Sequence, residues 1–361
     1  MTVSKISRYR NEIMGVAIVW VMLFHSQIDL SRIFWPAGFI KLMGYAGADI
    51  FFFLSGFGLY HGYRAGRLTT FEFYTVRLSK ILPAYWIMVT VYFLVEHLAW
   101  GTYSSLDWLF MLTGLNFFVQ EDKILWFIPA LACFYAMFPC MVRWAFEQGR
   151  SVAVKRVGIG IAAAVALSIV ITLTDLHYLL IMTIRFPVFI LGIYAGYLHV
   201  TEQKSFWFGS AGFNGLVMVF GLALLVLIVA VTPYEVGWRY GVGWYPFIVL
   251  TYPLCLMIAL ALDWLSDSAG HSPVWRMLKS FLSLCGRYSL EIFLIHVVLF
   301  ATVPEALKAF LPWAVEHPIN FLRIPEYGIL ALAAVCSAPV LNRITAPVRY
   351  RSAAVRRGDT P

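Results

Sequence analysis

The sequence predicts an all-α protein: a polytopic membrane helix bundle of about ten transmembrane helices, with both termini in the cytoplasm. The 361 residues are 61% hydrophobic and 13% charged, and their mean hydropathy is +0.78. Soluble domains contain about 45–50% apolar and about 25% charged residues. The apolar residues also run in stretches that reach the length of a bilayer crossing. This composition excludes a water-soluble globule, a disordered chain, a coiled coil and a disulfide-stapled secreted module.

Ten segments have the roughly 20 largely apolar residues that a membrane-spanning helix needs. Short connections join them, so we expect a single domain over residues 1–361. The first segment follows basic residues but lacks a small-x-small cleavage site, which favours a retained helix over a signal peptide. A shorter apolar stretch, 105–119, is predicted to be an interfacial or re-entrant helix. The ten predicted spans are 12–29, 42–62, 80–99, 124–145, 154–174, 178–198, 211–232, 244–264, 281–302 and 325–343.

The distribution of Lys and Arg predicts the orientation of these spans. With the N-terminus inside, 20 of the 27 basic residues fall on the cytoplasmic side, 6 on the other, and Arg185 within a span. Cytoplasmic loops carry an excess of Lys and Arg, so both termini are predicted inside, and 1–11 and 344–361 become cytoplasmic basic tails. Membrane topology thus explains the formal charge of +8, and no nucleic-acid partner is predicted.

Cofactor motifs are scarce in this chain. The five cysteines lie in or beside apolar runs, form no C-x-x-C pair and join no Cys/His cluster with metal-ligand spacing. They are interpreted as small buried side chains, and no metal site is predicted. Neither a P-loop nor a G-x-G-x-x-G turn is present, so ATP and NAD chemistry have no support.

Four titratable residues fall at similar depths in the predicted spans: His25, Asp49, Glu291 and His296. A charged side chain at mid-bilayer costs about 2.5–3.5 kcal/mol on insertion scales, so each requires a partner or a function. We expect the four to meet around one cavity inside the bundle. The alternatives are structural: His25 as an interhelical hydrogen-bonding residue, and Arg185 as a side chain that snorkels toward the outer surface.

A pair of cations marks the cytoplasmic start of the third predicted span. Arg77 and Lys80 stand three residues apart, on one helical face, in the segment Arg77-Leu-Ser-Lys80-Ile-Leu-Pro83-Ala-Tyr85. Such a pair can bind phosphate groups. The positive-inside bias predicts cations at this position as well, so both interpretations stay open.

Five motifs follow one another along the chain in a characteristic order. They are Gly15-Val-Ala-Ile-Val-Trp-Val-Met-Leu-Phe-His25, Gly47-Ala-Asp49-Ile-Phe-Phe-Phe-Leu-Ser55-Gly56-Phe, Arg77-x-x-Lys80-x-x-Pro83-x-Tyr85, Leu125-Trp126-Phe127-Ile128-Pro129, and Tyr288-Ser289-Leu290-Glu291 to His296. Together they resemble the acyltransferase-3 family of bacterial membrane O-acyltransferases. Two positions depart from the family pattern: Met14 replaces an Arg found in many members, with Arg10 one turn earlier, and Lys80 replaces an Arg.

The resemblance implies transfer of an acyl group, usually acetyl, from cytoplasmic acyl-CoA to a hydroxyl of an extracytoplasmic glycan or glycolipid, by a multi-pass protein of the inner (cytoplasmic) membrane. Acetyl-CoA is then the donor co-substrate. His25 is the expected general base, and Asp49 or Glu291 the acid that holds its imidazole. The residues expected to bind the donor are Arg77, Lys80, Arg10 and Tyr85, and those expected to line the cavity are Ser55, Trp126, Ser289 and His296.

Three alternatives remain. Intramembrane Asp, Glu and His also build proton relays, which favours a proton-coupled transporter of a small molecule or glycan precursor. Transporters often contain internal repeats, and none is visible here. A structural partner of a glycan-export complex is the third class of function. Within the enzyme hypothesis, an acyl-His or acyl-Ser intermediate at Ser55 or Ser289 is the alternative to direct transfer.

Overall fold

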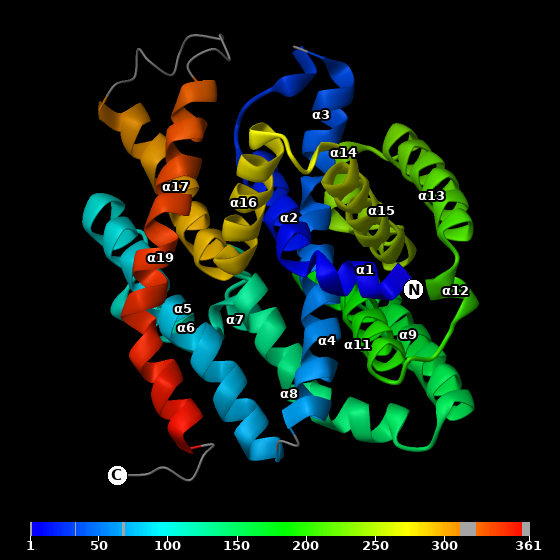
Figure 1. The fold of residues 1–361 in the computed structure, drawn as a ribbon. Helices are drawn as coiled ribbons and strands as arrows, with labels where there is room; N and C mark the ends of the chain where they lie inside the picture. Colours follow the sequence, from blue (N-terminus) through cyan, green and yellow to red (C-terminus); the bar gives the residue numbers. More distant parts are fainter. Residues whose placement is uncertain (1, 33, 67–68, 311–322, 356–361) are drawn as a thin grey trace. The chain divides into compact units, whose positions relative to one another are not determined.

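The computed structural model describes residues 2–32, 34–66, 69–310 and 323–355. These residues are helical almost throughout and contain no strand (Figure 1), so the all-α prediction is confirmed. Arg67, Arg356 and Arg357, which were counted on the predicted cytoplasmic side, lie outside the described residues, as does the end of the tail 344–361.

Within the described residues, nine helical segments are long and apolar enough to cross a membrane. They correspond to nine of the ten predicted spans, with ends that differ by up to ten residues. The chain is therefore a multi-pass membrane protein. The nine segments are Trp35–Arg64, Thr70–Trp100, Phe127–Phe146, Arg150–Thr172, His177–Val200, Ala211–Val231, Phe247–Ala269, Ser289–Ala309 and Arg323–Ala346.

Two predicted spans differ from the structure. The first, 12–29, is α2 (Arg10–His25), whose 16 residues extend about 24 Å at 1.5 Å per residue, less than the roughly 30 Å of a hydrocarbon core. The ninth, 281–302, starts too early. A break at Tyr288 separates the amphipathic α16 (Pro273–Arg287) from α17 (Ser289–Phe310). In the sequence, the apolar end of α16 runs into the apolar start of α17, so the two were predicted as one span.

The chain divides into two compact units, each built from three segments. The first comprises Met1–Ala17, Ala46–Thr70 and Cys133–Gly286, and the second Ile18–Tyr45, Phe71–Ala132 and Arg287–Pro361. The divisions fall inside α2, just before α4 (Ala46–Gly66), after the first residue of α5 (Thr70–Trp100), inside α8 (Phe127–Phe146) and before the last residue of α16.

The centre of the first unit is the close pairing of α4 (Ala46–Gly66) with α11 (Phe186–Val200), drawn side by side in Figure 1. Glycines from both helices face the backbone of the other. A Cβ at Gly192 would collide with the Phe53 carbonyl, and one at Gly56 with the Phe189 carbonyl. Small residues allow membrane helices to pack backbone against backbone. The Gly192-x-x-x-Gly196 pair therefore fixes the distance between α4 and α11.

The N-terminal helix α1 (Thr2–Arg8) is tied to α15 (Phe247–Ala269) through one carboxylate. Asp263 accepts a hydrogen bond from the Lys5 ammonium, one of 3.2 Å from Arg8 Nη1 and one of 2.9 Å from the Tyr9 hydroxyl. Other helices of the first unit are α9 (Arg150–Thr172), α10 (Leu180–Thr183), α12 (Phe206–Gly209), α13 (Ala211–Val231) and α14 (Tyr234–Arg239).

In the second unit, the stretch predicted at 105–119 forms two short helices, α6 (Ser105–Thr113) and α7 (Asn116–Val119). Gly114 adopts a left-handed conformation at φ 75°, which ends α6. At its start, Ser104 and Asp107 form a reciprocal capping box. The hydrogen bonds from the Ser104 hydroxyl and backbone N–H hold the pKa of Asp107 below its usual value. This unit also contains α3 (Trp35–Leu42), α17 and α19 (Arg323–Val355), together with all of α5 (Thr70–Trp100) except its first residue.

Candidate active site

His25 is the last residue of α2, and its side chain is exposed. The Ser26 hydroxyl bonds back to the Leu23 carbonyl at 2.7 Å, and the chain leaves the helical path after this residue. A helix end frees the imidazole from the crowding of a following turn. This position makes His25 accessible to a ligand while its backbone stays anchored in α2.

The imidazole of His25 contacts the imidazole of His296, on α17. The distance from His25 Nδ1 to His296 Nε2 is 2.9 Å, and the rings stack with centroids 5.1 Å apart. His296 is completely buried, and its Nδ1 lies 3.1 Å from the Ile292 carbonyl oxygen, one helical turn earlier. The sequence brought these two histidines to the same depth, and the structure makes them hydrogen-bonded neighbours.

Aromatic rings hold His296 in place. Phe293 and Phe300 each meet its ring edge-on, with centroids 5.4 Å away, and Tyr327 of α19 packs against Phe300 at 4.9 Å. These rings leave the buried imidazole little freedom to rotate, so His296 is a rigid partner for the exposed His25.

A pocket of about 380 Å³ opens beside His25. Its wall is mainly apolar and aromatic, with Trp126, Phe293 and Phe300, and Lys123 adds a cationic group. All lining residues belong to the second unit. A mostly apolar pocket with a few polar groups is the usual form of a small-molecule site. Trp126 was predicted to line the cavity, whereas Lys123 was not among the predicted site residues.

Glu291 lies at the start of α17, five residues before His296. It is buried, and its Oε1 accepts a hydrogen bond of 2.6 Å from Asn342 Nδ2 of α19. Figure 1 shows α17 and α19 side by side, so this bond joins the helix of His296 to its neighbour. Ser289, at the first position of α17, is buried as well.

Asn342 escaped the sequence analysis. It stands near the end of the predicted span 325–343, where an amide side chain indicates a hydrogen-bond partner. The partner itself was unpredictable, because Glu291 and Asn342 are 51 residues apart.

Asp49 belongs to the first unit, where it forms a buried ion pair with Arg185. Arg185 Nε lies 3.6 Å from Asp49 Oδ1, and each residue is 1% exposed. The guanidinium also donates to the Ile181 carbonyl at 2.7 Å and lies 4.9 Å from the centre of the Trp244 ring. Snorkelling of Arg185 toward the outer surface was therefore wrong: the carboxylate and the aromatic ring compensate its charge inside the protein.

Arg10 and Ser55 also lie in the first unit. Arg10 Nη2 donates to the Leu54 carbonyl of α4 at 3.3 Å, and the guanidinium packs against Gly58. Ser55 is half-buried on α4. The Arg10 guanidinium thus contacts the part of α4 that carries Ser55, six residues after Asp49.

The predicted donor-binding residues on α5 differ in exposure. Lys80 is exposed, and Arg77 is partly exposed with its guanidinium 6.0 Å from the centre of the Phe73 ring. Tyr85 is buried, and its hydroxyl donates to the Met111 carbonyl at 2.5 Å, which ties α5 to α6. Both cations are less buried than Tyr85, whose hydroxyl is used for packing.

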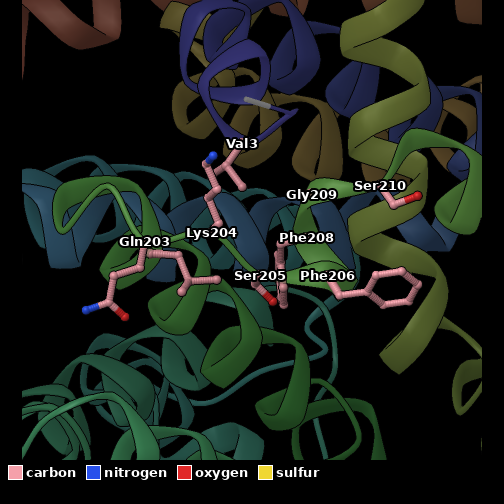
Figure 2. A pocket seen from close by; sticks show the side chains of 9 residues that line it. Val3, Gln203, Lys204, Ser205, Phe206, Phe208, Gly209 and Ser210 are labelled. Atoms are coloured by element: carbon pink, nitrogen blue, oxygen red, sulfur yellow. The ribbon is translucent and has the colours of Figure 1, made fainter.

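A second pocket, of about 430 Å³, lies in the first unit. It is formed by the end of α11, the turn that follows and α12, with Val3 contributed by α1 (Figure 2). Phe206 and Phe208 form its apolar wall, and Lys204 is its cationic residue.

The sequence predicts no metal site. In the part of the chain that the structure describes, no group of three or more His, Cys, Asp or Glu residues is placed to hold a metal ion.

Comparison with known proteins identifies the family. The family model Acyl_transf_3, an acyltransferase domain, matches residues 14–343, nearly the whole chain. The match includes His25, His296 and the pocket beside them. Searches of curated proteins and of solved structures gave no significant match. The protein is a multi-pass membrane acyltransferase that belongs to the acyltransferase-3 family.

Proposed function

We propose that this protein transfers an acyl group, most simply acetyl, from acyl-CoA to a hydroxyl of an extracytoplasmic glycan or glycolipid in the inner membrane, with His25 as general base. The observation that carries the proposal is the exposed imidazole of His25, which lines the pocket and is held from behind by the buried His296. The family match supports acyl transfer, and the geometry supports the choice of base.

The reaction needs a base because a sugar hydroxyl is a poor nucleophile near neutral pH. His25 removes the hydroxyl proton as the oxygen attacks the thioester carbon, which contributes typically about 10²–10⁴-fold. The carbon–sulfur bond then breaks, and the CoA thiolate leaves and takes the proton from the imidazolium. An O-acyl ester and free CoA thiol result, and His25 returns to its neutral form.

The mostly apolar pocket beside His25 suits the acceptor. Trp126 offers a flat apolar surface to a sugar ring, and Lys123 offers a cation to a phosphate or carboxylate group of a glycan or glycolipid. We assign the donor phosphates to Arg77 and Lys80, because two cations three residues apart on one helical face fit a polyphosphate. Catalytic or binding roles remain predictions from the sequence and the resemblance for six further residues: Asp49, Glu291, Arg10, Tyr85, Ser55 and Ser289.

The proposal is tested by His25→Ala. Protein reconstituted in nanodiscs is supplied with labelled acetyl-CoA and with glycan and lipid-linked glycan extracted from cells that lack it. We expect transfer of label to fall by about 10²–10⁴-fold. The matched control is His271→Ala, at an exposed turn between α15 and α16, which keeps wild-type turnover. Unchanged turnover in well-inserted His25→Ala protein would remove His25 from the reaction.

The same preparation separates the alternative functions. Label that remains on the protein after denaturation indicates a covalent acyl intermediate. Proton flux that depends on a substrate, without consumption of acyl-CoA, contradicts the enzyme and favours a transporter. Comparison of O-acyl groups on surface and lipid-linked glycans, with and without the protein, identifies the acceptor.

A further inference from the structure

Three polar groups form a chain that ends at the pocket. The Ile292 carbonyl oxygen lies 3.1 Å from His296 Nδ1, and His296 Nε2 lies 2.9 Å from His25 Nδ1. His25 Nε2 is the remaining nitrogen, on a side chain that lines the pocket. All of these atoms belong to the second unit. The direction of each hydrogen bond in this chain can be deduced from its first member.

A carbonyl oxygen has no proton and can only accept, so His296 Nδ1 carries the hydrogen. A neutral imidazole has one N–H and one lone pair, which makes His296 Nε2 an acceptor. The atom that faces it, His25 Nδ1, must then donate. Neutral His25 consequently carries its proton on Nδ1, and its Nε2 has the free lone pair.

The deduction depends on a neutral His296. This imidazole is completely buried among Phe293 and Phe300, and burial of an ionised group without a compensating charge is very costly. His25, by contrast, is exposed and can carry a transient charge. An added proton therefore resides on His25, where the Nδ1–H···Nε2 bond to His296 becomes charge-assisted and stronger.

We propose that His296 is a positioning residue that fixes the tautomer of His25, so that Nε2 is the atom that receives the acceptor proton. This role rests on the proposed function. His296 takes the place that a carboxylate holds in a Ser-His-Asp triad, but as a neutral acceptor. The proton moves from the acceptor hydroxyl to His25 Nε2 and later to the CoA thiolate, and the protonation of His296 does not change.

The tautomer can be measured without any turnover. The full-length protein is labelled with ¹⁵N-histidine in nanodiscs, and nitrogen–proton correlations show which ring nitrogen of each imidazole carries the proton. Signals are assigned by their loss in His25→Gln and His296→Gln. We expect His25 protonated at Nδ1 and His296 protonated at Nδ1. A neutral His25 protonated at Nε2, or a cationic His296, overturns the proposal.

Enzyme kinetics test the role in the reaction. His296→Gln keeps an acceptor near the position of Nε2, whereas His296→Leu removes it. We expect His296→Leu to lower kcat at least tenfold and up to about 10⁴-fold, the loss seen when a triad imidazole takes the wrong tautomer. The KM for acyl-CoA should stay within about twofold, and His296→Gln should recover most of kcat. Equal losses in both variants contradict the positioning role.

The two proposals fail in different ways. If His25→Ala keeps full turnover, the proposed function of His25 is wrong, whatever its tautomer. If His25→Ala is inactive but His25 is protonated at Nε2 in the wild-type protein, the base is correct and the role of His296 is wrong. The spectra of the wild-type protein also decide the tautomer if either His296 variant does not fold.

Discussion

Asp49 and Arg185 show how single charged residues are accommodated inside this membrane protein. Both are almost completely buried, on α4 and at the start of α11, and their side chains lie 3.6 Å apart between Nε and Oδ1. The stacking of the guanidinium on Trp244 and its bond to the Ile181 carbonyl add further compensation. Buried pairs of this kind stabilise less than they cost when one partner is removed.

We therefore predict that Asp49→Asn lowers the free energy of unfolding by about 3–5 kcal/mol, because it leaves the Arg185 guanidinium buried without its counter-charge. The double variant Asp49→Leu with Arg185→Leu should lose less than the sum of the two single changes. The measurement is a double-mutant cycle from reversible unfolding in detergent, so catalytic activity plays no part in it.

Glu305 and Lys308 provide a matched control for this cycle. They form an ion pair of 2.5 Å on α17, and both side chains are exposed. Glu305→Gln should change stability by no more than about 1 kcal/mol, since exposed pairs contribute little. Equal costs for Asp49→Asn and Glu305→Gln would contradict the account of the buried pair.

At the scale of helices, contact between backbones decides which glycines matter. The Gly192 Cα faces the Phe53 carbonyl of α4, and Gly196 faces the Phe57 carbonyl one turn later. Gly158, in α9, has no atom within 4 Å of the place where a Cβ would stand. Both Gly192 and Gly158 are helical glycines in apolar runs, and the sequence alone does not separate them.

Gly192→Ala is predicted to destabilise the protein by about 1–3 kcal/mol, because the added methyl group forces α11 away from α4. Gly158→Ala makes the same chemical change in open space. It should stabilise its helix by up to about 1 kcal/mol, the intrinsic preference for Ala over Gly. Thermal unfolding of the two purified variants against wild type measures both effects. If Gly192→Ala unfolds at the same temperature as Gly158→Ala or at a higher one, the close contact between α4 and α11 is contradicted.

At the scale of the whole molecule, the number of membrane crossings depends on α2. Nine described segments meet the length of a span, while the 16 residues of α2 fall short of it. An N-terminus and a C-terminus on the same side need an even number of crossings, so the predicted topology requires α2 to cross as a tenth helix. A bilayer thinned locally around a short helix would allow this.

Single cysteines in a cysteine-free background test this topology in intact cells. We predict that a membrane-impermeant maleimide labels Phe34→Cys and Thr102→Cys from outside, and that Ser4→Cys and Glu147→Cys react only after permeabilisation. All four positions are exposed. Reaction of Ser4→Cys from outside would show an odd number of crossings and overturn the prediction for the N-terminus.

The sequence by itself determined the class of this protein and nine of its spans, and it supplied the predicted residues of the candidate site. Hydropathy and the excess of basic residues on one side are properties of local segments, and the five motifs carry the family resemblance without reference to folding. His25 and His296 could be proposed for one cavity because both are titratable residues at similar depths in the predicted spans, and Trp126 was assigned to that cavity through the resemblance.

Only the tertiary structure decided which side chains are partners. His25 and His296 are 271 residues apart, and Glu291 and Asn342 are 51 apart, so no local pattern predicts either bond. The sequence favoured a carboxylate beside His25, since carboxylates commonly hold catalytic imidazoles. The structure places a second imidazole at Nδ1, because the packing of α17 brings that face of the helix to the end of α2. Partners are set by the crossing of helices, and crossings depend on contacts far apart in the chain.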